Sequence, residues 1–103
     1  MTIYRPDRWV IIEVNSVHGK YKKILASWIG GFASADSWKL SSAIRSVSEK
    51  KEFLEFFNES GSIYICHKTA YGTSLFTESI LEGFKIGLKK DQSLKVLEKY
   101  DGI

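Results

Sequence analysis

Three neighbouring residues near the middle of the chain could bind a ligand. Asp36, Trp38 and Lys39 bring a carboxylate, an indole and an amine together just after a Gly-Gly pair. An aromatic plane with a flanking lysine can stack a base and hold its phosphate. However, Trp38 is in phase with Leu40 and Ile44, which favours a place in the core for its ring. Both interpretations remain open at this point.

A second group follows an apolar stretch and precedes a glycine turn. His67, Lys68 and Tyr71 stand at the end of this stretch, and Thr73 and Ser74 follow them. Backbone N–H groups and hydroxyls at the start of a helix can bind an anion, with Lys68 nearby. Ser and Thr also begin most helices simply as caps, which is the simpler interpretation. A small-anion or nucleotide pocket at this strand–helix junction is therefore an alternative.

Catalysis and metal binding have little support in the sequence. Asp36 and His67 are the only pair that we would nominate for acid–base chemistry, so no catalytic residue is assigned. Cys66 and His67 are adjacent in a predicted strand and point to opposite faces, which prevents a Cys–His nucleophile pair. His18 lies in a predicted loop, and the two histidines and one cysteine lack metal-ligand spacing. We expect an inert, buried Cys66, no metal site and no cofactor.

The N-terminal third predicts a β-hairpin. Trp9 to Val14 is a β-branched run with apolar residues on both faces, typical of a strand covered on both sides. The turn residues Asn15, Ser16 and Gly19 follow, and Tyr21 to Ile29 returns as a second strand.

The segment from Ser37 to Arg45 predicts one half-buried strand. Its apolar residues alternate with polar ones, so that one face is expected to be buried and the other wet. The buried set is Trp38, Leu40 and Ile44, and the wet set is Lys39, Ser41 and Arg45. The wet face is either solvated surface or a partner surface.

The segment from Ser62 to Lys68 predicts another strand, with Ile63 and Ile65 inward and Tyr64 and Cys66 opposite. An amphipathic helix over Leu75 to Lys89 is then expected, capped by Thr73 or Ser74. Its apolar stripe is Phe76, Ile80, Leu81, Phe84 and Leu88.

Two segments are ambiguous. The phenylalanines within residues 49–59 have helical spacing, so the pattern narrowly favours a helix, although a strand through Phe57 is the alternative. Residues 93–100 form either a last strand or a short helix.

Size and composition indicate one globular domain over residues 1–103. The 26% of charged residues and the net charge of +3 are ordinary for a soluble protein and too weak for a dedicated nucleic-acid binder. A single cysteine suits a reducing compartment, and no apolar run is long enough for a membrane span. We therefore expect a cytoplasmic protein without membrane contact.

Several short segments together resemble a group of small tailed-bacteriophage proteins for which no activity is established. The segments are Arg8-Trp9-Val10, Trp28-Ile29-Gly30-Gly31-Phe32, Asp36-Ser37-Trp38-Lys39-Leu40-Ser41-Ser42, Ser60-Gly61-Ser62-Ile63-Tyr64-Ile65-Cys66-His67-Lys68 and Tyr71-Gly72-Thr73-Ser74. The resemblance covers about Arg8 to Phe84. It implies a phage accessory protein made in the host cytosol, and it favours a strand at Glu52 to Phe57.

The predicted fold is α+β, an antiparallel meander sheet of about five strands with one amphipathic helix packed on it. The predicted function is a non-enzymatic phage accessory protein that binds a host or defence-system component, either a protein or a nucleotide-like ligand. One alternative is weak nucleic-acid binding through Lys39, Arg45 and Lys68, and the second is the anion pocket at the strand–helix junction. The candidate ligand-binding residues are Asp36, Trp38, Lys39, His67, Lys68 and Tyr71. The oligomeric state stays open.

Overall fold

The strand β2 (Arg8–Ser16) runs through the centre of the molecule and carries apolar side chains on both faces. It belongs to a computed structural model that describes residues 2–30 and 35–100, so Gly31 and Phe32 of the segments above lie outside the described residues. The other elements are β1 (Ile3–Tyr4), β3 (Gly19–Trp28), β4 (Ser37–Leu40), β5 (Ile44–Glu49), β6 (Phe53–Asn58), β7 (Ile63–His67), the short 3-10 helix η2 (Lys68–Ala70), α1 (Leu75–Ile86) and β8 (Ser93–Val96).

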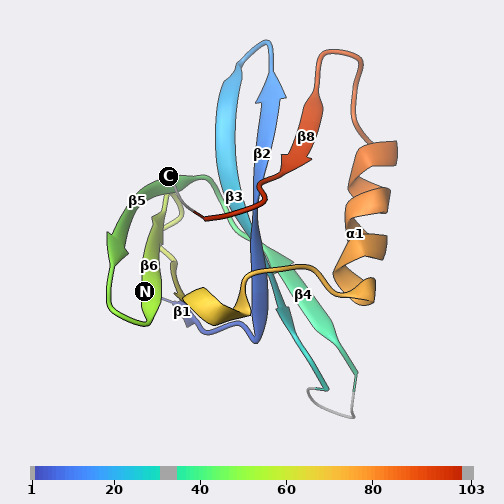
Figure 1. Cartoon of the computed structure of the whole chain (residues 1–103). Coiled ribbons are helices and arrows are strands. Elements are labelled where there is room, and N and C mark those ends of the chain that lie inside the picture. The colour runs from blue at the N-terminus through green and yellow to red at the C-terminus, as the bar shows by residue number, and fades with distance from the viewer. Residues whose placement is uncertain (1, 31–34, 101–103) are drawn as a thin grey trace.

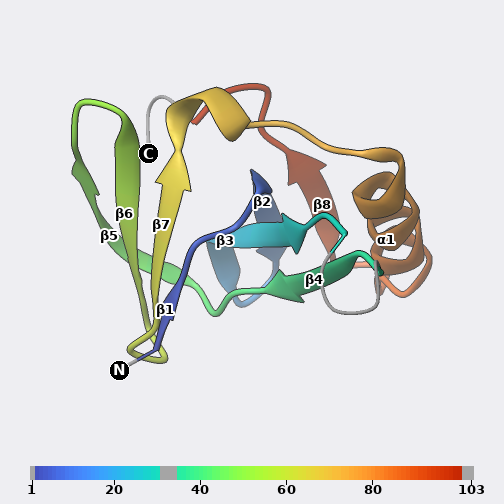
Figure 2. The ribbon, with the colours of Figure 1, turned by 90° about the horizontal axis from the view of Figure 1, so that it is seen from below.

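The strands form two four-stranded sheets. Sheet A has the order β1-β7-β6-β5 and sheet B the order β4-β3-β2-β8. All pairs between these strands are antiparallel except β1 with β7. The α+β class is confirmed, with two sheets in place of one five-stranded meander. Sheet A, sheet B and α1 lie one after the other as three layers (Figures 1 and 2).

The predicted hairpin is confirmed as β2 and β3. Gly19 closes the turn with φ of 136°, a conformation that residues other than glycine rarely adopt. The Ser16 hydroxyl accepts a hydrogen bond from the backbone N–H of His18 at 3.1 Å. The register pairs Trp9 with Ala26 and Val10 with Leu25, which sends alternate side chains into two separate layers.

The first layer lies between the two sheets. Its fully buried residues come from β2 and β3 on one side and from β6 and β7 on the other: Trp9, Ile11, Ile24, Ala26, Leu54, Phe56, Tyr64 and Cys66. The indole of Trp9 joins the sheets, because its Nε1–H donates to the carbonyl of His67 at 2.7 Å. The centroid of its ring also lies 5.3 Å from the ring centroid of Phe56.

The second layer lies between sheet B and α1. Val10, Ile12 and Leu25 pack there against Leu81 of the helix. The predicted cap is confirmed at Ser74, where a capping box with Thr77 begins α1. The helix is shorter than predicted, since Gly87 ends it and Leu88 lies beyond its last turn.

The single strand predicted over Ser37 to Arg45 is wrong. The chain leaves sheet B after Leu40 and enters sheet A at Ile44, so the segment is divided between β4 and β5. Ser41 at the crossing is buried, and its hydroxyl accepts from the N–H of Ile24 at 2.8 Å. The predicted wet position of Ser41 is therefore wrong.

Trp38 on β4 is 41% exposed, so its predicted burial is also wrong. The indole packs edge-on against Phe84 of α1, with the ring centroids 5.4 Å apart, at the margin of the second layer.

The predicted faces of β7 are inverted. Tyr64 and Cys66 are fully buried against sheet B, whereas Ile63 and Ile65 lie on the opposite side and are partly exposed. The ring of Tyr64 faces the layer between the two sheets, where it packs in one buried cluster with Trp9 and Phe56.

The two ambiguous segments are both strands. Residues 53–58 form β6, in agreement with the phage resemblance and against the helical spacing of the phenylalanines. Residues 93–96 form β8, which pairs with β2 in the register Val14 to Leu94.

Candidate functional site

The first predicted group does not form one site. The carboxylate of Asp36 accepts from the N–H of Gly30 at 2.9 Å, which holds the end of the preceding loop. Successive residues of β4 point to opposite faces, so Trp38 lies against α1 while the Nζ of Lys39 lies 5.3 Å from the ring centroid of Tyr4 in β1.

The second group has structural partners of its own. The imidazole of His67 packs edge-on against Phe53, with centroids 6.3 Å apart, and the Nζ of Lys68 lies 2.7 Å from a carboxylate oxygen of Glu49. Among the described residues, no hydrogen bond joins Asp36 to His67. The structure therefore does not assemble the acid–base pair considered above.

Tyr71 connects two distant segments of the chain through hydrogen bonds. Its hydroxyl donates to the carbonyl of Leu97 at 2.6 Å and accepts from the N–H of Ile11 at 3.1 Å. Burial raises its pKa, and the hydrogen bond from Ile11 acts in the opposite direction. Both capacities of the hydroxyl are used within the protein, so Tyr71 holds the C-terminal segment onto β2.

The strand–helix junction uses its polar groups for capping. The hydroxyl of Ser74 accepts from the N–H of Thr77, and the hydroxyl of Thr73 donates to Glu78 at 3.2 Å. At Gly72, φ is 147° and the position of a Cβ would lie 2.6 Å from a guanidinium nitrogen of Arg8. The hydrogen bonds of Ser74 and Thr73 support the capping interpretation, whereas the Nε of Arg8 is buried and has no hydrogen-bond partner among the described residues.

Cys66 is chemically quiet. It is fully buried, and burial raises the pKa of its thiol above the ordinary value, which suppresses the reactive thiolate. Within residues 2–30 and 35–100, no group of three His, Cys, Asp or Glu residues is placed to hold a metal ion.

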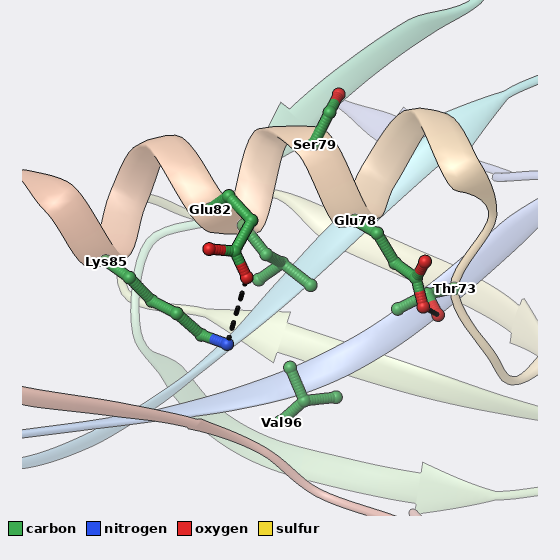
Figure 3. Close-up of a pocket in the computed structure, with 7 residues that line it drawn as sticks. Thr73, Glu78, Ser79, Glu82, Lys85 and Val96 are labelled. Atoms are coloured by element: carbon green, nitrogen blue, oxygen red, sulfur yellow. Dashed lines mark hydrogen bonds and ion pairs between the residues drawn. The ribbon is translucent and has the colours of Figure 1, made fainter.

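A hollow of about 550 Å³ lies between α1 and β8 (Figure 3). The side chain of Glu82 lies 3.5 Å from the Nζ of Lys85, and Glu78 accepts from Thr73. Lys85 is therefore paired with Glu82, Glu78 is hydrogen-bonded to a neutral hydroxyl, and Val96 and Leu81 supply the apolar lining.

The outer face of sheet A is different, because its apolar side chains have no cover. Positions alternate along β6 and β7, so one face is buried and the other is partly exposed. We call this second side the open face; its residues on these two strands are Phe53, Glu55, Phe57, Ile63, Ile65 and His67. None of the described helices or strands covers it (Figure 2).

One row of the open face crosses the whole sheet. Ile3 pairs with Ile63, Ile63 with Phe57, and Phe57 with Ser46. Ile3 at the sheet edge is 47% exposed. Isolated apolar residues on a surface are normal, whereas neighbouring ones commonly mark an interaction site.

A hollow of about 400 Å³ opens at this row, lined among others by Phe57, Ile63 and Arg45. Arg45 is exposed, and its guanidinium makes no ion pair with another described residue. Elsewhere on the face, Glu55 lies 3.7 Å from the Nζ of Lys50. The hollow therefore combines an apolar wall with one positive charge that is available to a partner.

The open-face residues were missed because Ile63 and Ile65 were assigned to the core. A signal was present in the sequence: in Ser62 to Lys68, Tyr64 and Cys66 are as apolar as the two isoleucines. A strand with two apolar faces needs two covers, as we inferred for Trp9 to Val14. In the described part of the chain, β7 is covered on one face only, the face that packs against sheet B.

Comparison with known proteins found no matching family model, no matching curated protein and no matching solved structure. Within the part of the chain that the structure describes, no helix is both long and apolar enough to cross a membrane.

Proposed function

We propose that this chain is a non-enzymatic accessory protein of a tailed bacteriophage, which binds a host or defence-system protein through the open face of sheet A. The carrying observation is the row of Ile63 and Phe57 on an uncovered sheet, beside a hollow with Arg45 at its edge. The resemblance of the short segments supports the phage origin, and a protein of this origin would be made in the cytosol of the host.

The chemistry of the face defines the partner. An apolar anchor side chain in the hollow would pack against Phe57 and Ile63, and burial of such a side chain supplies most of the affinity at a typical interface centre. A carboxylate next to this anchor would pair with Arg45, because a guanidinium holds a carboxylate through two parallel hydrogen bonds. We therefore propose a protein partner with an acidic residue beside an apolar one.

Photocrosslinking tests this proposal directly. A photoreactive phenylalanine analogue replaces Phe57 in one variant and Ile86 in a control variant, and each is expressed in host cells during infection. Ile86 is 84% exposed on α1, so the control probe is at least as accessible. The expected result is a discrete protein crosslinked from position 57 and not from position 86.

A second arm tests the chemistry of the identified partner. Phe57→Glu and Arg45→Glu should each weaken binding of the purified partner by about tenfold or more, since both lie in the hollow. Ile86→Glu should leave binding unchanged. Equal crosslinking from both positions, or crosslinks only to a second copy of this chain, would contradict the proposal. Catalytic turnover lost in His67→Ala or Asp36→Ala would contradict its non-enzymatic part.

A further inference from the structure

A third hollow lies at the β6–β7 turn, between that turn, β1 and β4. Its volume is about 610 Å³. The residues that matter in it are Tyr4, Lys39, Ser42, Ser60, Ser62 and Tyr64. We call it the serine pocket. It shares Gly61 and Ser62 with the hollow at the open face, but its charged residue is Lys39 and not Arg45, so the inference does not depend on the proposed partner.

The serine pocket carries a positive charge. Among the described residues that line it, Lys39 is the only one with a charged side chain. Its ammonium group lies above the ring of Tyr4, and it makes no ion pair within the described part of the chain. An aromatic face attracts a cation but leaves its N–H groups free to donate elsewhere.

The three serines have one hydroxyl proton more than they use among themselves. The hydroxyl of Ser42 donates to that of Ser60 at 3.0 Å, and the hydroxyls of Ser60 and Ser62 lie 3.0 Å apart. The hydroxyl of Ser62 also lies 3.4 Å from the amide nitrogen of Asn58, which donates to it. Two hydrogen bonds link three hydroxyls and use two protons, so the third proton has no acceptor in this chain of hydroxyls.

Tyr64 adds a further unused donor. Its side chain is fully buried, and its hydroxyl makes no hydrogen bond with any described residue. Burial raises its pKa to about 12, so the hydroxyl keeps its proton at physiological pH. The ring of Tyr4, on the two-residue strand β1, stacks on Tyr64 with centroids 4.8 Å apart. A buried polar group without a partner is uncommon and calls for an explanation.

We infer that the serine pocket binds a phosphate group, either free or as the end of a nucleotide, with Lys39 supplying the charge and a serine hydroxyl donating to its oxygens. The buried Tyr64 hydroxyl becomes a second donor when the ring of Tyr4, which stacks on Tyr64, shifts as the ligand binds. The pocket offers spare donors and a positive charge, which suits a ligand that only accepts. A tetrahedral phosphate has more oxygens than a carboxylate to receive these donors, and lysine binds phosphate readily as a point charge.

The test is a calorimetric titration of the full chain at constant ionic strength with inorganic phosphate, adenosine 5′-monophosphate and acetate. Saturable binding of phosphate or the nucleotide, with none of acetate, is expected. Tighter binding of the nucleotide identifies an esterified phosphate as the ligand, and equal or weaker binding identifies the free ion. Absent binding of both phosphates, or equal binding of acetate, would overturn the inference.

Two variants and one control locate the site. Lys39→Gln should weaken phosphate binding by about tenfold or more, the usual loss for a hydrogen bond to a charged group. Lys90→Gln removes an exposed lysine outside the pocket and should have no effect. Tyr64→Phe should fold normally, because the lost hydroxyl has no partner, and should bind phosphate several-fold more weakly. Unchanged affinity in Lys39→Gln would overturn the assignment.

Amide resonances provide a readout that does not depend on substitution. Phosphate should shift the amide signals of Lys39, Ser42 and residues 60–62. Shifts confined instead to residues 72–77 would place the anion at the start of α1 and overturn the inference.

Discussion

The outer faces of the two sheets carry similar side chains but end in opposite surroundings. On sheet B, Ile12 and Leu25 face α1 and are covered by Leu81. On sheet A, Phe57 and Ile63 lie on the partly exposed face of β6 and β7, and no described helix or strand covers this side of the sheet (Figure 2). This difference shows that the pattern of apolar residues in a strand predicts whether one or both of its faces are apolar. Which apolar face is buried depends on the helices and sheets that are available to pack on it. The described part of the chain has one long helix for two such faces.

The sharpest way to break this comparison is the same substitution on both faces. Ile12→Thr buries a hydroxyl and leaves a cavity beneath α1, so we expect a loss of about 2–4 kcal/mol in the free energy of unfolding. Ile65→Thr keeps the β-branched shape on the partly exposed face and should cost about 1 kcal/mol or less. Urea denaturation of both variants measures the difference. Equal losses would show that the open face is covered in solution.

Stability at alkaline pH tests the buried face of sheet A, on which Tyr64 lies. Because burial raises the pKa of Tyr64 from 10.0 to about 12, the unfolded chain releases this proton at lower pH than the folded protein. The contribution of Tyr64 to stability is therefore complete below pH 10 and is lost as pH rises to 12, by up to about 2 kcal/mol.

The check is denaturant unfolding between pH 8 and pH 12 for the wild type and Tyr64→Phe. The variant should lose less stability than the wild type over the upper part of this range. Parallel curves would mean that the Tyr64 hydroxyl reaches water, and the buried face of β7 would then be misplaced.

The smallest expected loss of stability comes from a change in α1, the helix that covers sheet B. Ser74→Ala removes the capping box at the start of α1 and should cost about 1 kcal/mol. The fraying should raise amide exchange in the first turn of the helix and leave β6 and β7 unchanged, because sheet A does not depend on this helix. Faster exchange in sheet A after this substitution would contradict the three-layer arrangement.

Local sequence signals predicted the elements well where neighbours agreed with them. The hairpin follows from β-branched runs around Gly19, and α1 follows from the Ser74 cap and the spacing of its apolar residues. The break between β4 and β5 was not predictable, because the alternation from Trp38 to Ile44 continues smoothly through the crossing. Only the packing of two sheets on each other buries Ser41 and directs the chain out of sheet B.

The candidate site was harder to predict for a related reason. Lys39 was a candidate ligand-binding residue in the sequence, but its pocket neighbours Tyr4 and Tyr64 are 60 residues apart and meet only through the parallel pairing of β1 and β7. The open face depends on which side of β7 meets sheet B. Neither relation is encoded in a short stretch of sequence.

The two-sided strand β2 also has a consequence for synthesis. The β2–β3 hairpin can form once residue 28 has left the ribosome, yet the strands of sheet A that cover one of its faces follow up to His67, and α1, which covers the other face, follows up to Ile86. At 5–20 residues per second, α1 is complete roughly 3–12 s after the hairpin. Until then, at least one apolar face of the hairpin is exposed to other nascent chains. We therefore expect this hairpin to be the part of the nascent chain most prone to aggregation during synthesis.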